Sequence, residues 1–516
     1  MLAVRPRRPT PATARSLSLS APTGGWNARD SLSDMAPNDA VSLVNWFPAA
    51  TYCQMRYGYS RFATGITGTV ETLMSYQGGA TSKLFAAAST RIYDITAGGT
   101  ASSSVTGLTN ARWQYINNST AAGNYIQLVN GADKMRVFDG TNWHADGDGS
   151  PYDVTGVNTA TCIGIAVSHN RVWFVQSSTL KAWYLPTGAI GGAATAFDLS
   201  SFCDRGGYLM AIGTWTMDAG YGMDDMTVFV TSEGEVLVYR GTDPASSATW
   251  GLIGVYWIGS PVGRRCLLKY QGDLLIITRD GVSPMSLALQ SSRINPRVNI
   301  TDKIQYAVSQ AVTNYASNYG WQLLPFPNEN MLFLNVPLQE GVTQQQYVMN
   351  TITRSWCSFT GWNASCWELY DDMPYFGGVG YVGKAWNTFA DASGNILANG
   401  LQSFNYLGNR AANKQFTQMR PVFQTNGTPT VLTQMNIDFD LSDPTASAAF
   451  SPTSYGIWGT SLWGNALWGD SLQISQEWQG AVGVGRCAAP HVIANCQGFN
   501  LQWLSTDVIW KPGSLL

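Results

Sequence analysis

The sequence is poor in charged residues and in long apolar runs, and each shortage excludes a class of protein. Only 12% of the 516 residues are Asp, Glu, Lys or Arg, about half of the ~25% that an ordinary soluble domain carries. The net charge of −3 argues against a tight nucleic-acid binder, which needs clustered Lys and Arg to displace counterions from phosphates. No run of about eighteen apolar residues occurs, so we expect no membrane-spanning helix.

Aromatic residues are abundant, with 20 Trp, 23 Tyr and 19 Phe in a chain that is 45% apolar. Such a content excludes a disordered chain. Because the cores of protein interfaces are poor in charge and rich in Tyr and Trp, the composition favours a component of a larger assembly. A secreted β-rich protein with a polar, uncharged surface is the alternative that composition leaves open.

Basic residues cluster only at the start of the chain, at Arg5, Arg7, Arg8 and Arg15, among several prolines. The stretch lacks an apolar core and therefore does not have the pattern of a signal peptide. We expect an extended arm here.

Eight cysteines are scattered along the chain without a C-x-x-C motif, which is far too few for a disulfide scaffold. Cys357 and Cys366 are nine residues apart, as are Cys487 and Cys496, and either pair could meet across a hairpin. Buried, reduced thiols are the default expectation.

Alternating apolar strands broken by turn residues dominate the sequence. The first example is Leu84–Ala88, Ser89-Thr90 and Arg91–Ile95, a strand, a tight turn and a second strand. The same pattern recurs in four further places, at Tyr125–Phe138, Arg171–Leu185, Met226–Arg240 and Leu274–Met285.

The spacing of these hairpins is regular. Equivalent positions fall at Tyr93, Phe138, Trp183, Tyr239 and Met285, which gives a period of roughly 45 residues, typical of a propeller blade with two visible strands and room for two more. The sequence therefore predicts a mainly all-β fold, a β-propeller with additional β-domains. A long array of β-sandwiches is the competing interpretation.

Apolar residues adopt helical spacing over Asn299–Asn318 only, with Thr301 as the expected N-cap and Asp302 in the first turn. We predict a helix inserted between blades. The rhythm of the strands changes after about residue 395. The predicted domains are an N-terminal extended arm with the first strands (1–64), a propeller (65–395) and a C-terminal β-domain (396–516).

A tandem repeat lies near the C-terminus, where Trp458, Trp463 and Trp468 each precede a glycine at an interval of five residues. The interval fits neither a helix nor a flat strand and indicates successive tight turns. We expect these rings to pack structurally or to contact another subunit, with sugar binding as the alternative.

One glycine-rich run, Gly378–Lys384, matches part of a phosphate-binding loop. Such a loop continues with Ser or Thr into a helix, whereas here Ala385 follows and the pattern continues as a strand. We therefore predict a hairpin that binds no nucleotide.

The candidate metal and catalytic motifs are also incomplete. Asp146, Asp148 and Asp153 lack the bidentate Glu of a calcium loop, so a solvated turn is expected there. The three histidines, His144, His169 and His491, do not have the spacing of metal ligands. Glu233 and Glu235 flank one glycine in a turn, which does not supply the two facing carboxylates of a glycosidase. We predict no catalytic, cofactor-binding or metal-binding residues and no enzymatic activity.

Several short motifs together resemble a known family, the tail nozzle and hub proteins of short-tailed bacteriophages, of the tail-tubular-protein-B and packaged-DNA-stabilisation types. The motifs, each loose by itself, span most of the chain: Gly24–Asp30, Met35-Ala36-Pro37, Asp39-Ala40, Asn45–Pro48, Arg56-Tyr57-Gly58, Asp280-Gly281-Val282, Ile300–Ile304, Leu334–Pro337, Tyr347–Trp356, Phe376–Lys384, Asp391–Ile396 and Arg420-Pro421.

The resemblance implies a structural protein of the virion tail that is assembled in the bacterial cytoplasm. It implies a homohexameric ring around the DNA exit channel, below the adaptor of the head-to-tail connector and in contact with tail fibres or a needle. Such a ring retains packaged DNA and allows its ejection, with no sequence-specific binding. The acidic balance of residues 297–516, with 9 Lys and Arg against 13 Asp and Glu, suits a wall past which DNA slides.

Two rival functions remain. A receptor- or glycan-binding propeller, such as an adhesin or a secreted lectin, predicts a monomer or trimer with saturable sugar binding. A polysaccharide-degrading enzyme predicts a cleft with paired carboxylates.

Overall fold

The computed structural model describes residues 13–218, 223–288, 296–447 and 472–513, and the chain forms two compact units. The first unit comprises Met1–Gly58, Ser355–Phe359 and Thr388–Leu516, and the second comprises Tyr59–Arg354 and Thr360–Asn387. Strands dominate both units, so the fold is mainly all-β, as the sequence predicts. Among the described residues, no helix is long and apolar enough to cross a membrane.

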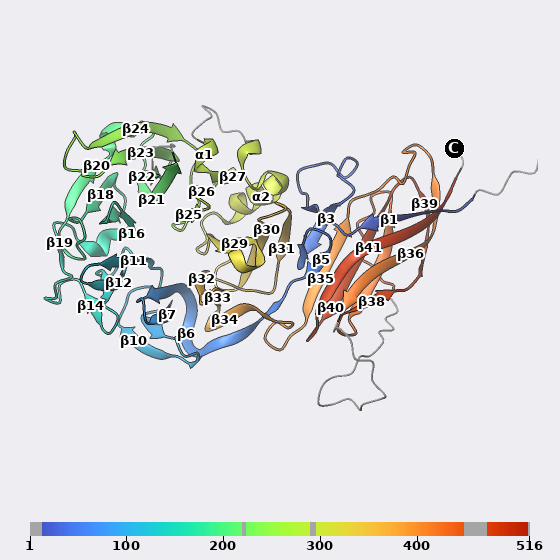
Figure 1. The fold of residues 1–516 in the computed structure, drawn as a ribbon, viewed down its shortest axis with the longest axis horizontal. Coiled ribbons are helices and arrows are strands. Elements are labelled where there is room, and N and C mark those ends of the chain that lie inside the picture. The colour runs from blue at the N-terminus through green and yellow to red at the C-terminus, as the bar shows by residue number, and fades with distance from the viewer. Residues whose placement is uncertain (1–12, 219–222, 289–295, 448–471, 514–516) are drawn as a thin grey trace, which may run out of the picture. The chain divides into compact units, whose positions relative to one another are not determined.

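The second unit is a β-propeller, in which small sheets stand around a common centre (Figure 1). Blades 1 to 4 have four strands each, and blades 5 to 7 contribute three strands each. The strands of blades 1 and 2 are β6 (Gly58–Gln77), β7 (Ser82–Ala88), β8 (Arg91–Asp94), β10 (Ser102–Thr106), and β11 (Gln114–Thr120), β12 (Gly123–Val129), β13 (Arg136–Phe138), β14 (Trp143–Ala145). Those of blades 3 and 4 are β16 (Cys162–Ser168), β17 (Arg171–Gln176), β18 (Lys181–Tyr184), β20 (Thr195–Asp198), and β21 (Leu209–Asp218), β22 (Met223–Thr231), β23 (Glu235–Gly241), β24 (Trp250–Trp257).

The remaining blades complete the ring. Their strands are β25 (Leu267–Tyr270), β26 (Asp273–Thr278), β27 (Gly281–Pro284) in blade 5, β28 (Gln322–Phe326), β29 (Met331–Gln339), β30 (Thr343–Asn350) in blade 6, and β32 (Cys366–Tyr370), β33 (Met373–Gly377), β34 (Val379–Thr388) in blade 7. Two-residue strands lie outside this pattern: β9 (Gly99–Thr100) pairs with β6, and β15 (Val154–Thr155) pairs with β19 (Gly192–Ala193).

The long strand β6 closes the ring. It pairs with β34 of blade 7 on one side and, through Val70–Gln77, with β7 of blade 1 on the other. Gly65 and Gly68 lie within β6 with φ of 77° and 87°, a backbone conformation that glycine adopts without steric cost. An early segment of the propeller therefore completes its last blade, which ties sequence-distant ends of the unit together.

The predicted period of about 45 residues is confirmed, and it marks equivalent positions in successive blades. Tyr93, Phe138, Trp183 and Tyr239 lie on the third strands of blades 1 to 4, and Met285 directly follows the third strand of blade 5. The five predicted hairpins are the second and third strands of blades 1 to 5. These strands stand out in the sequence because both of their faces are buried against neighbouring blades.

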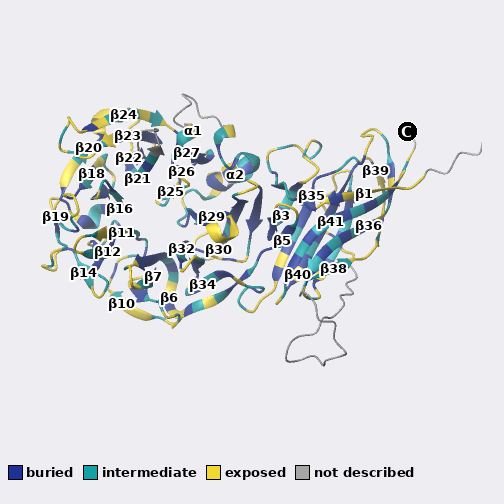
Figure 2. Cartoon of the chain, viewed as in Figure 1, coloured by how far each residue is buried: buried dark blue, intermediate teal, exposed yellow. Residues whose placement is uncertain are grey.

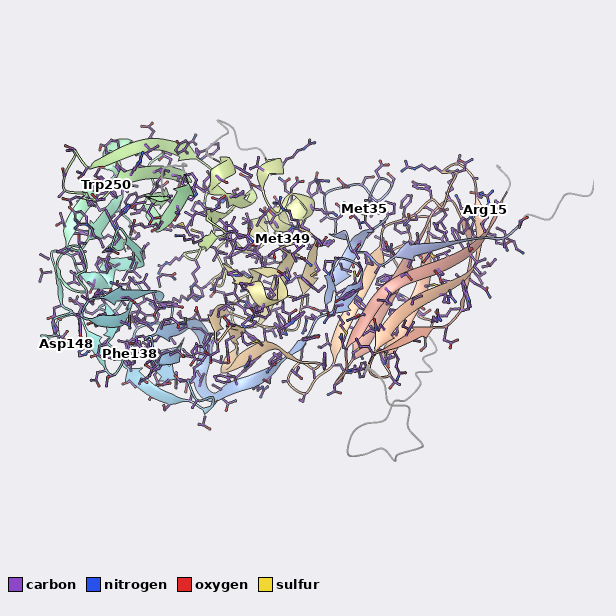
Figure 3. All side chains as sticks on the ribbon, in the orientation of Figure 1. Arg15, Met35, Phe138, Asp148, Trp250 and Met349 are labelled. Atoms are coloured by element: carbon purple, nitrogen blue, oxygen red, sulfur yellow. The ribbon has the colours of Figure 1, made fainter. Side chains whose placement is uncertain are left out.

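Aromatic rings fill the space between blades. Phe85 of blade 1 meets Phe138 of blade 2 with ring centroids 4.9 Å apart, and Trp173 of blade 3 stacks on Trp250 of blade 4 at 5.9 Å (Phe138 and Trp250 are labelled in Figure 3). Such pairs contribute roughly 0.5–1.5 kcal/mol beyond the burial of their area. Exposed residues gather instead on outer strands such as β10 and β24 (Figure 2).

The predicted helix is present, although shorter than expected. The helix α2 (Gln305–Tyr315) lies between β27 and β28, and therefore between blades 5 and 6. Thr301 is the N-cap residue of a 3-10 turn over Asp302–Ile304 that runs directly into α2, with Asp302 in its first turn as expected, but its side chain makes no capping hydrogen bond. The Thr301 hydroxyl instead accepts a hydrogen bond from the Val282 amide at 3.1 Å. A four-residue helix, α1 (Met285–Ala288), and 3-10 turns η1 (Thr159–Thr161), η2 (Ser200–Phe202), η3 (Pro296–Val298), η4 (Asp302–Ile304) and η5 (Pro327–Glu329) complete the described helical elements.

The first unit contains two sheets whose strands are mostly antiparallel. The first sheet has the strand order β38-β36-β41-β5-β4, and in addition β1 pairs with β41 and β39 pairs with β36. Its strands are β38 (Gln473–Gln476), β36 (Lys414–Thr425), β41 (Leu501–Pro512), β5 (Cys53–Met55), β4 (Trp46–Pro48), β1 (Arg15–Ser20) and β39 (Gln479–Gly485). In the other, β3 (Asp39–Val44), β35 (Ile396–Gln402), β40 (Ala488–Cys496) and β37 (Thr430–Ile437) are consecutive neighbours, with β31 (Trp356–Phe359) and β2 (Gly25–Trp26) beside β3. Phe416, Met419 and Val508 of the first sheet pack with Met435 and Ala488 of the second.

The N-terminal segment does not stand apart as the sequence analysis expected. Residues 1–12 lie outside the described part, but Arg15–Ser20 forms β1, which pairs in antiparallel register with Ser505–Trp510 of β41. Leu19 is only 6% exposed and belongs to the core of the first unit. The strands before residue 58 therefore share one unit with the C-terminal β-domain instead of forming a separate domain over residues 1–64.

Candidate functional site

A cavity of about 430 Å³ occupies the centre of the propeller. The first strand of every blade contributes to its wall, which includes Leu73, Gln114, Ile165, Ala211, Leu267, Gln322 and Glu368. Because each blade presents its innermost strand, polar side chains distant in sequence converge here. The volume lies within the ~300–1,000 Å³ range of small-molecule sites.

Glu368 is the acidic group of this cavity. Its Oε1 accepts a hydrogen bond from the Ser75 hydroxyl at 2.8 Å, and the Tyr115 hydroxyl also bonds its carboxylate. Burial raises the pKa of Glu368 to about 7, against an ordinary value of 4.5, although these hydrogen bonds and the charge of Arg265 oppose the rise. A buried carboxyl that titrates near neutrality in a cavity marks a candidate site.

Arg265 spans the cavity from the start of blade 5. Its Nη2 donates to the Thr72 hydroxyl at 2.8 Å and to the Trp113 carbonyl at 3.1 Å, and its Nη1 donates to Gln322 Oε1 at 3.2 Å. The guanidinium therefore connects blades 1, 2, 5 and 6. Among the described residues, no carboxylate lies within 4.0 Å of it.

A second cavity of about 360 Å³ lies where the innermost strands begin. Met210, Arg264 and Arg265 line both cavities, so the two adjoin, and the second cavity is called the mouth of the propeller. Tyr319, Trp321 and Arg112 also line this mouth. The Arg265 guanidinium lies 5.4 Å from the centre of the Tyr319 ring, which places an aromatic face against the charge.

Arg112 is neutralised at the side of the mouth. Its Nε donates to Glu71 at 2.9 Å and its Nη2 donates to Glu340 at 2.8 Å. Both carboxylates line a separate, smaller cavity of about 180 Å³. Arg264 has no such partner among the described residues, where its guanidinium donates only to the Asn130 carbonyl, at 3.4 Å.

The glycine-rich run forms the hairpin that the sequence predicts. Gly378 donates its amide to the Tyr381 carbonyl at 2.9 Å, and the chain continues as β34 through Ala385 to Thr388. The run is thus followed by a strand, and its backbone amides are arranged by pairing with β33.

The carboxylates of the acidic loop hold the loop itself together. Asp146 is buried, and its carboxylate accepts from the Val154 amide and the Thr159 hydroxyl. Asp153 accepts from the amides of Gly147 and Gly149, while Asp148 lies exposed at the outer rim of the propeller (Figure 3). No group of three potential metal ligands occurs among the described residues.

The Glu235 carboxylate, in the turn that also carries Glu233, binds backbone amides. Glu235 is 4% exposed and accepts hydrogen bonds from the amides of Asp204 and Arg205, both at 3.1 Å. Its role is therefore to hold the preceding loop.

The histidines are engaged in separate places. His144 contacts Asp139 at 3.1 Å, His169 contacts the Asp225 carbonyl at 3.0 Å, and His491 contacts Asn399 at 2.8 Å.

The eight cysteines are free thiols, and all but Cys203 are buried. The expectation of reduced, mostly buried thiols is therefore confirmed. Cys487 and Cys496 do not meet across a hairpin, because Cys487 precedes β40 and Cys496 ends it. At about 3.3 Å per residue, the two lie at opposite ends of one extended strand. Cys357 and Cys366 lie on β31 and β32. The Trp458, Trp463 and Trp468 repeat falls outside the described residues.

The motifs that carry the family resemblance meet in pairs. Buried Arg56 forms two hydrogen bonds to Asp391, from Nη1 at 2.8 Å and from Nη2 at 2.5 Å, and its Nε donates to Asn45 at 2.9 Å. A side chain on Gly58 would collide with the Ala390 carbonyl, beside Asp391. Residues more than 300 positions apart in sequence therefore form one network.

Further motif residues are coupled in the same way. A side chain on Gly25, whose φ is 80°, would collide with the Trp356 backbone. Val282 bonds Thr301, as described above. Buried Asn335 of the propeller differs, because its partners lie outside the motifs: it donates to the carbonyls of Gly320 and Ala364 and accepts from Gln346 and Trp367.

Sequence reasoning missed the central site. Two features point to it in retrospect. Arg264 and Arg265 are adjacent cations just before a strand in a chain of low charge, and Glu368 interrupts the otherwise uncharged strand Cys366–Tyr370. Neither feature says that the two segments, about a hundred residues apart, face the same cavity.

No family model matches the sequence, and no curated protein matches it significantly. Among solved structures, the chain is similar to BBS1N, solved in complex with ARL6DN, with 9% identity and a TM-score of 0.39 over 65% of this chain and 99% of that one. It is also similar to the β-propeller domain of Cps50 (Swd1) from Myceliophteria thermophila, with 11% identity and a TM-score of 0.40 over 64% of this chain and 100% of that one. YCF48 from Cyanidioschyzon merolae has 11% identity and a TM-score of 0.31, over 65% and 98% of the two chains.

Proposed function

We propose that this chain is a structural, non-enzymatic subunit of the tail nozzle or hub of a short-tailed bacteriophage. In this role several copies, six by the family resemblance, form a ring around the channel through which DNA leaves the virion. The adaptor of the head-to-tail connector and the tail fibres or needle are its neighbours. The observation that carries the proposal is the pairwise meeting of the resembling motifs.

The physical argument concerns how such motifs arise. Loose matches that occur by chance are scattered over a fold, because nothing couples their positions. Here Arg56 bonds Asp391, Gly25 approaches Trp356 and Val282 bonds Thr301. Motif residues that contact one another in the folded protein depend on one another's size and charge. Their contacts therefore support the family resemblance more than isolated matches would.

An exposed apolar strand supports assembly. Val482 and Val484 on β39 are 93% and 65% exposed, and Ile474 on the neighbouring β38 is 62% exposed. Among the described strands, β39 pairs only with β36, so no described strand covers its other edge. An open, apolar edge is a hazard that natural proteins usually cover. We propose that a second copy of the chain covers it in the ring.

In a closed ring, the exposed edge of β39 in one subunit would contact the next subunit. Contacts in a ring are heterologous, so one face of each subunit fits a different face of the next. The low charge of the chain agrees with extensive coverage by neighbours.

Imaging of the purified protein by electron microscopy tests the ring. We expect rings with a central pore from the wild type, and isolated subunits from the double variant Val482→Asp, Val484→Asp. The matched control is Ile352→Asp, which charges an equally exposed apolar residue, 72% exposed, on a turn of the propeller; it leaves the rings intact. Monomers of the wild type at all concentrations, together with tails that lack ring density for this chain, would refute the proposal.

The alternative function is binding of a receptor or glycan by the propeller, and the central cavity favours it. It predicts a monomer or trimer that binds a sugar saturably. Glycan-array binding by a chain that forms no ring would select this alternative.

A further inference from the structure

The mouth of the propeller has an unbalanced positive charge. Arg112, Arg264 and Arg265 line it, and none of the described residues in its lining is acidic. Glu71 and Glu340 neutralise Arg112 from outside the mouth. Two guanidinium groups, those of Arg264 and Arg265, remain with neutral acceptors only.

This arrangement is unusual for a chain with a net charge of −3. Arg265 is the less exposed of the two, and a partly enclosed arginine without a counterion is costly, because its charge is removed from water without full compensation. Concave walls of low dielectric also focus the field of such charges and raise the local concentration of anions. Glu368 lies on the wall of the central cavity. Because burial raises its pKa to about 7, its carboxyl group is partly protonated at neutral pH and balances only part of the positive charge of the two arginines.

The remaining lining favours a small polar ligand. Asn110, Asn130 and Asn318 provide amides, and Trp321 and Tyr319 provide aromatic rings. The volume of about 360 Å³ lies at the lower end of the ~300–1,000 Å³ range of small-molecule sites. The planar guanidinium matches a carboxylate or a phosphate through paired hydrogen bonds.

We propose that the mouth of the propeller binds a small anion, whose carboxylate or phosphate group contacts Arg264 and Arg265. The site belongs to each propeller by itself and does not depend on assembly into a ring. Arg265 contacts four blades as well as the ligand, whereas Arg264 is exposed and makes one long hydrogen bond, to the Asn130 carbonyl, besides its contact with the ligand.

Calorimetric titration of the full chain at constant ionic strength tests this site with three probes: inorganic phosphate, D-glucuronate and D-glucose. Binding of phosphate alone identifies a phosphate site, and binding of glucuronate alone identifies a carboxylate site; either result supports the proposal. Glucose controls for the sugar ring without its charge, and we expect no binding of it. Absence of binding by both anions, or equal binding of glucose and glucuronate, overturns the proposal.

Variants locate the site. Arg264→Gln removes an exposed charge and only one long hydrogen bond, that to the Asn130 carbonyl at 3.4 Å, so we expect the protein to fold. Its affinity for the bound anion should fall about tenfold or more, as for a lost charge-assisted hydrogen bond. The matched control is Arg91→Gln, which removes an exposed arginine on β8 of the same propeller and leaves affinity unchanged. Equal affinities of wild type and Arg264→Gln would overturn the assignment, as would an equal loss in Arg91→Gln.

Discussion

The buried ion pair between Arg56 and Asp391 allows a sharp test of the network in the first unit. The Arg56 side chain is 1% exposed and that of Asp391 is 14% exposed, and two hydrogen bonds join them. Asp391→Asn keeps the shape of the side chain and removes its charge. The substitution therefore leaves a buried guanidinium uncompensated without creating a cavity.

The expected cost follows from burial. Removing one partner of a buried pair costs about 3–5 kcal/mol, because the other charge stays desolvated. At about 2–4 °C per kcal/mol for a unit of this size, the melting temperature of the first unit should fall by roughly 10 °C. The matched control is Asp34→Asn, which breaks the pair of Asp34 with Arg410, whose side chains are 67% and 65% exposed; an exposed pair contributes only about 0–1 kcal/mol.

The assay combines thermal unfolding with hydrogen–deuterium exchange, which assigns the loss to a unit. In Asp391→Asn, peptides of β3 and β35 should exchange faster, while propeller peptides such as those of β12 stay protected. A cost as small as that of Asp34→Asn would refute the reasoning, since it would mean that the buried pair holds nothing together.

Three further predictions follow from the same structure. In the folded state the pKa of Glu368 is about 7, against an ordinary value of 4.5, so folding takes up a proton between these pH values. The free energy of unfolding of the propeller should therefore fall by about 3 kcal/mol as the pH rises from about 4.5 to 7. Glu368→Gln should abolish this fall and be more stable than the wild type above pH 7; an unchanged pH profile contradicts the assignment. Burial raises the pKa of the thiols, for example that of Cys203 to about 11, so a thiol reagent should label the native protein slowly and all eight cysteines after unfolding; fewer than eight would reveal a disulfide. Deletion of residues 1–12 should leave the melting temperature unchanged, whereas deletion of residues 1–20 should lower it because it removes β1 and the buried Leu19; equal melting of both truncations would show that β1 contributes no stability.

The sequence predicted the features that repeat locally. The hairpins Leu84–Ile95 and Met226–Arg240 were visible because both of their faces are buried, which produces apolar runs between turn residues. The innermost strands were harder to recognise. They carry polar residues such as Gln114, Gln322 and Glu368, which face the central cavity and interrupt the apolar pattern.

The boundaries of the units were beyond sequence reasoning for a related reason. The change of rhythm near residue 395 was visible, and the second unit ends close to it, at Asn387. The return of Arg15–Ser20 to β41, however, pairs residues almost 500 positions apart. No local periodicity encodes such a partner, because strand pairing depends on where the whole chain brings its ends.

The sequence by itself determined the class of the fold, its repeat and the hairpin nature of the glycine-rich run, because alternation, turn residues and spacing are local properties. Only the tertiary structure decided which polar groups meet. It placed Arg265, Ser75 and Glu368 around one cavity and Arg56 against Asp391. The physical reason is the ring itself: every blade turns its first strand to a common centre, so residues that no sequence pattern connects become neighbours there.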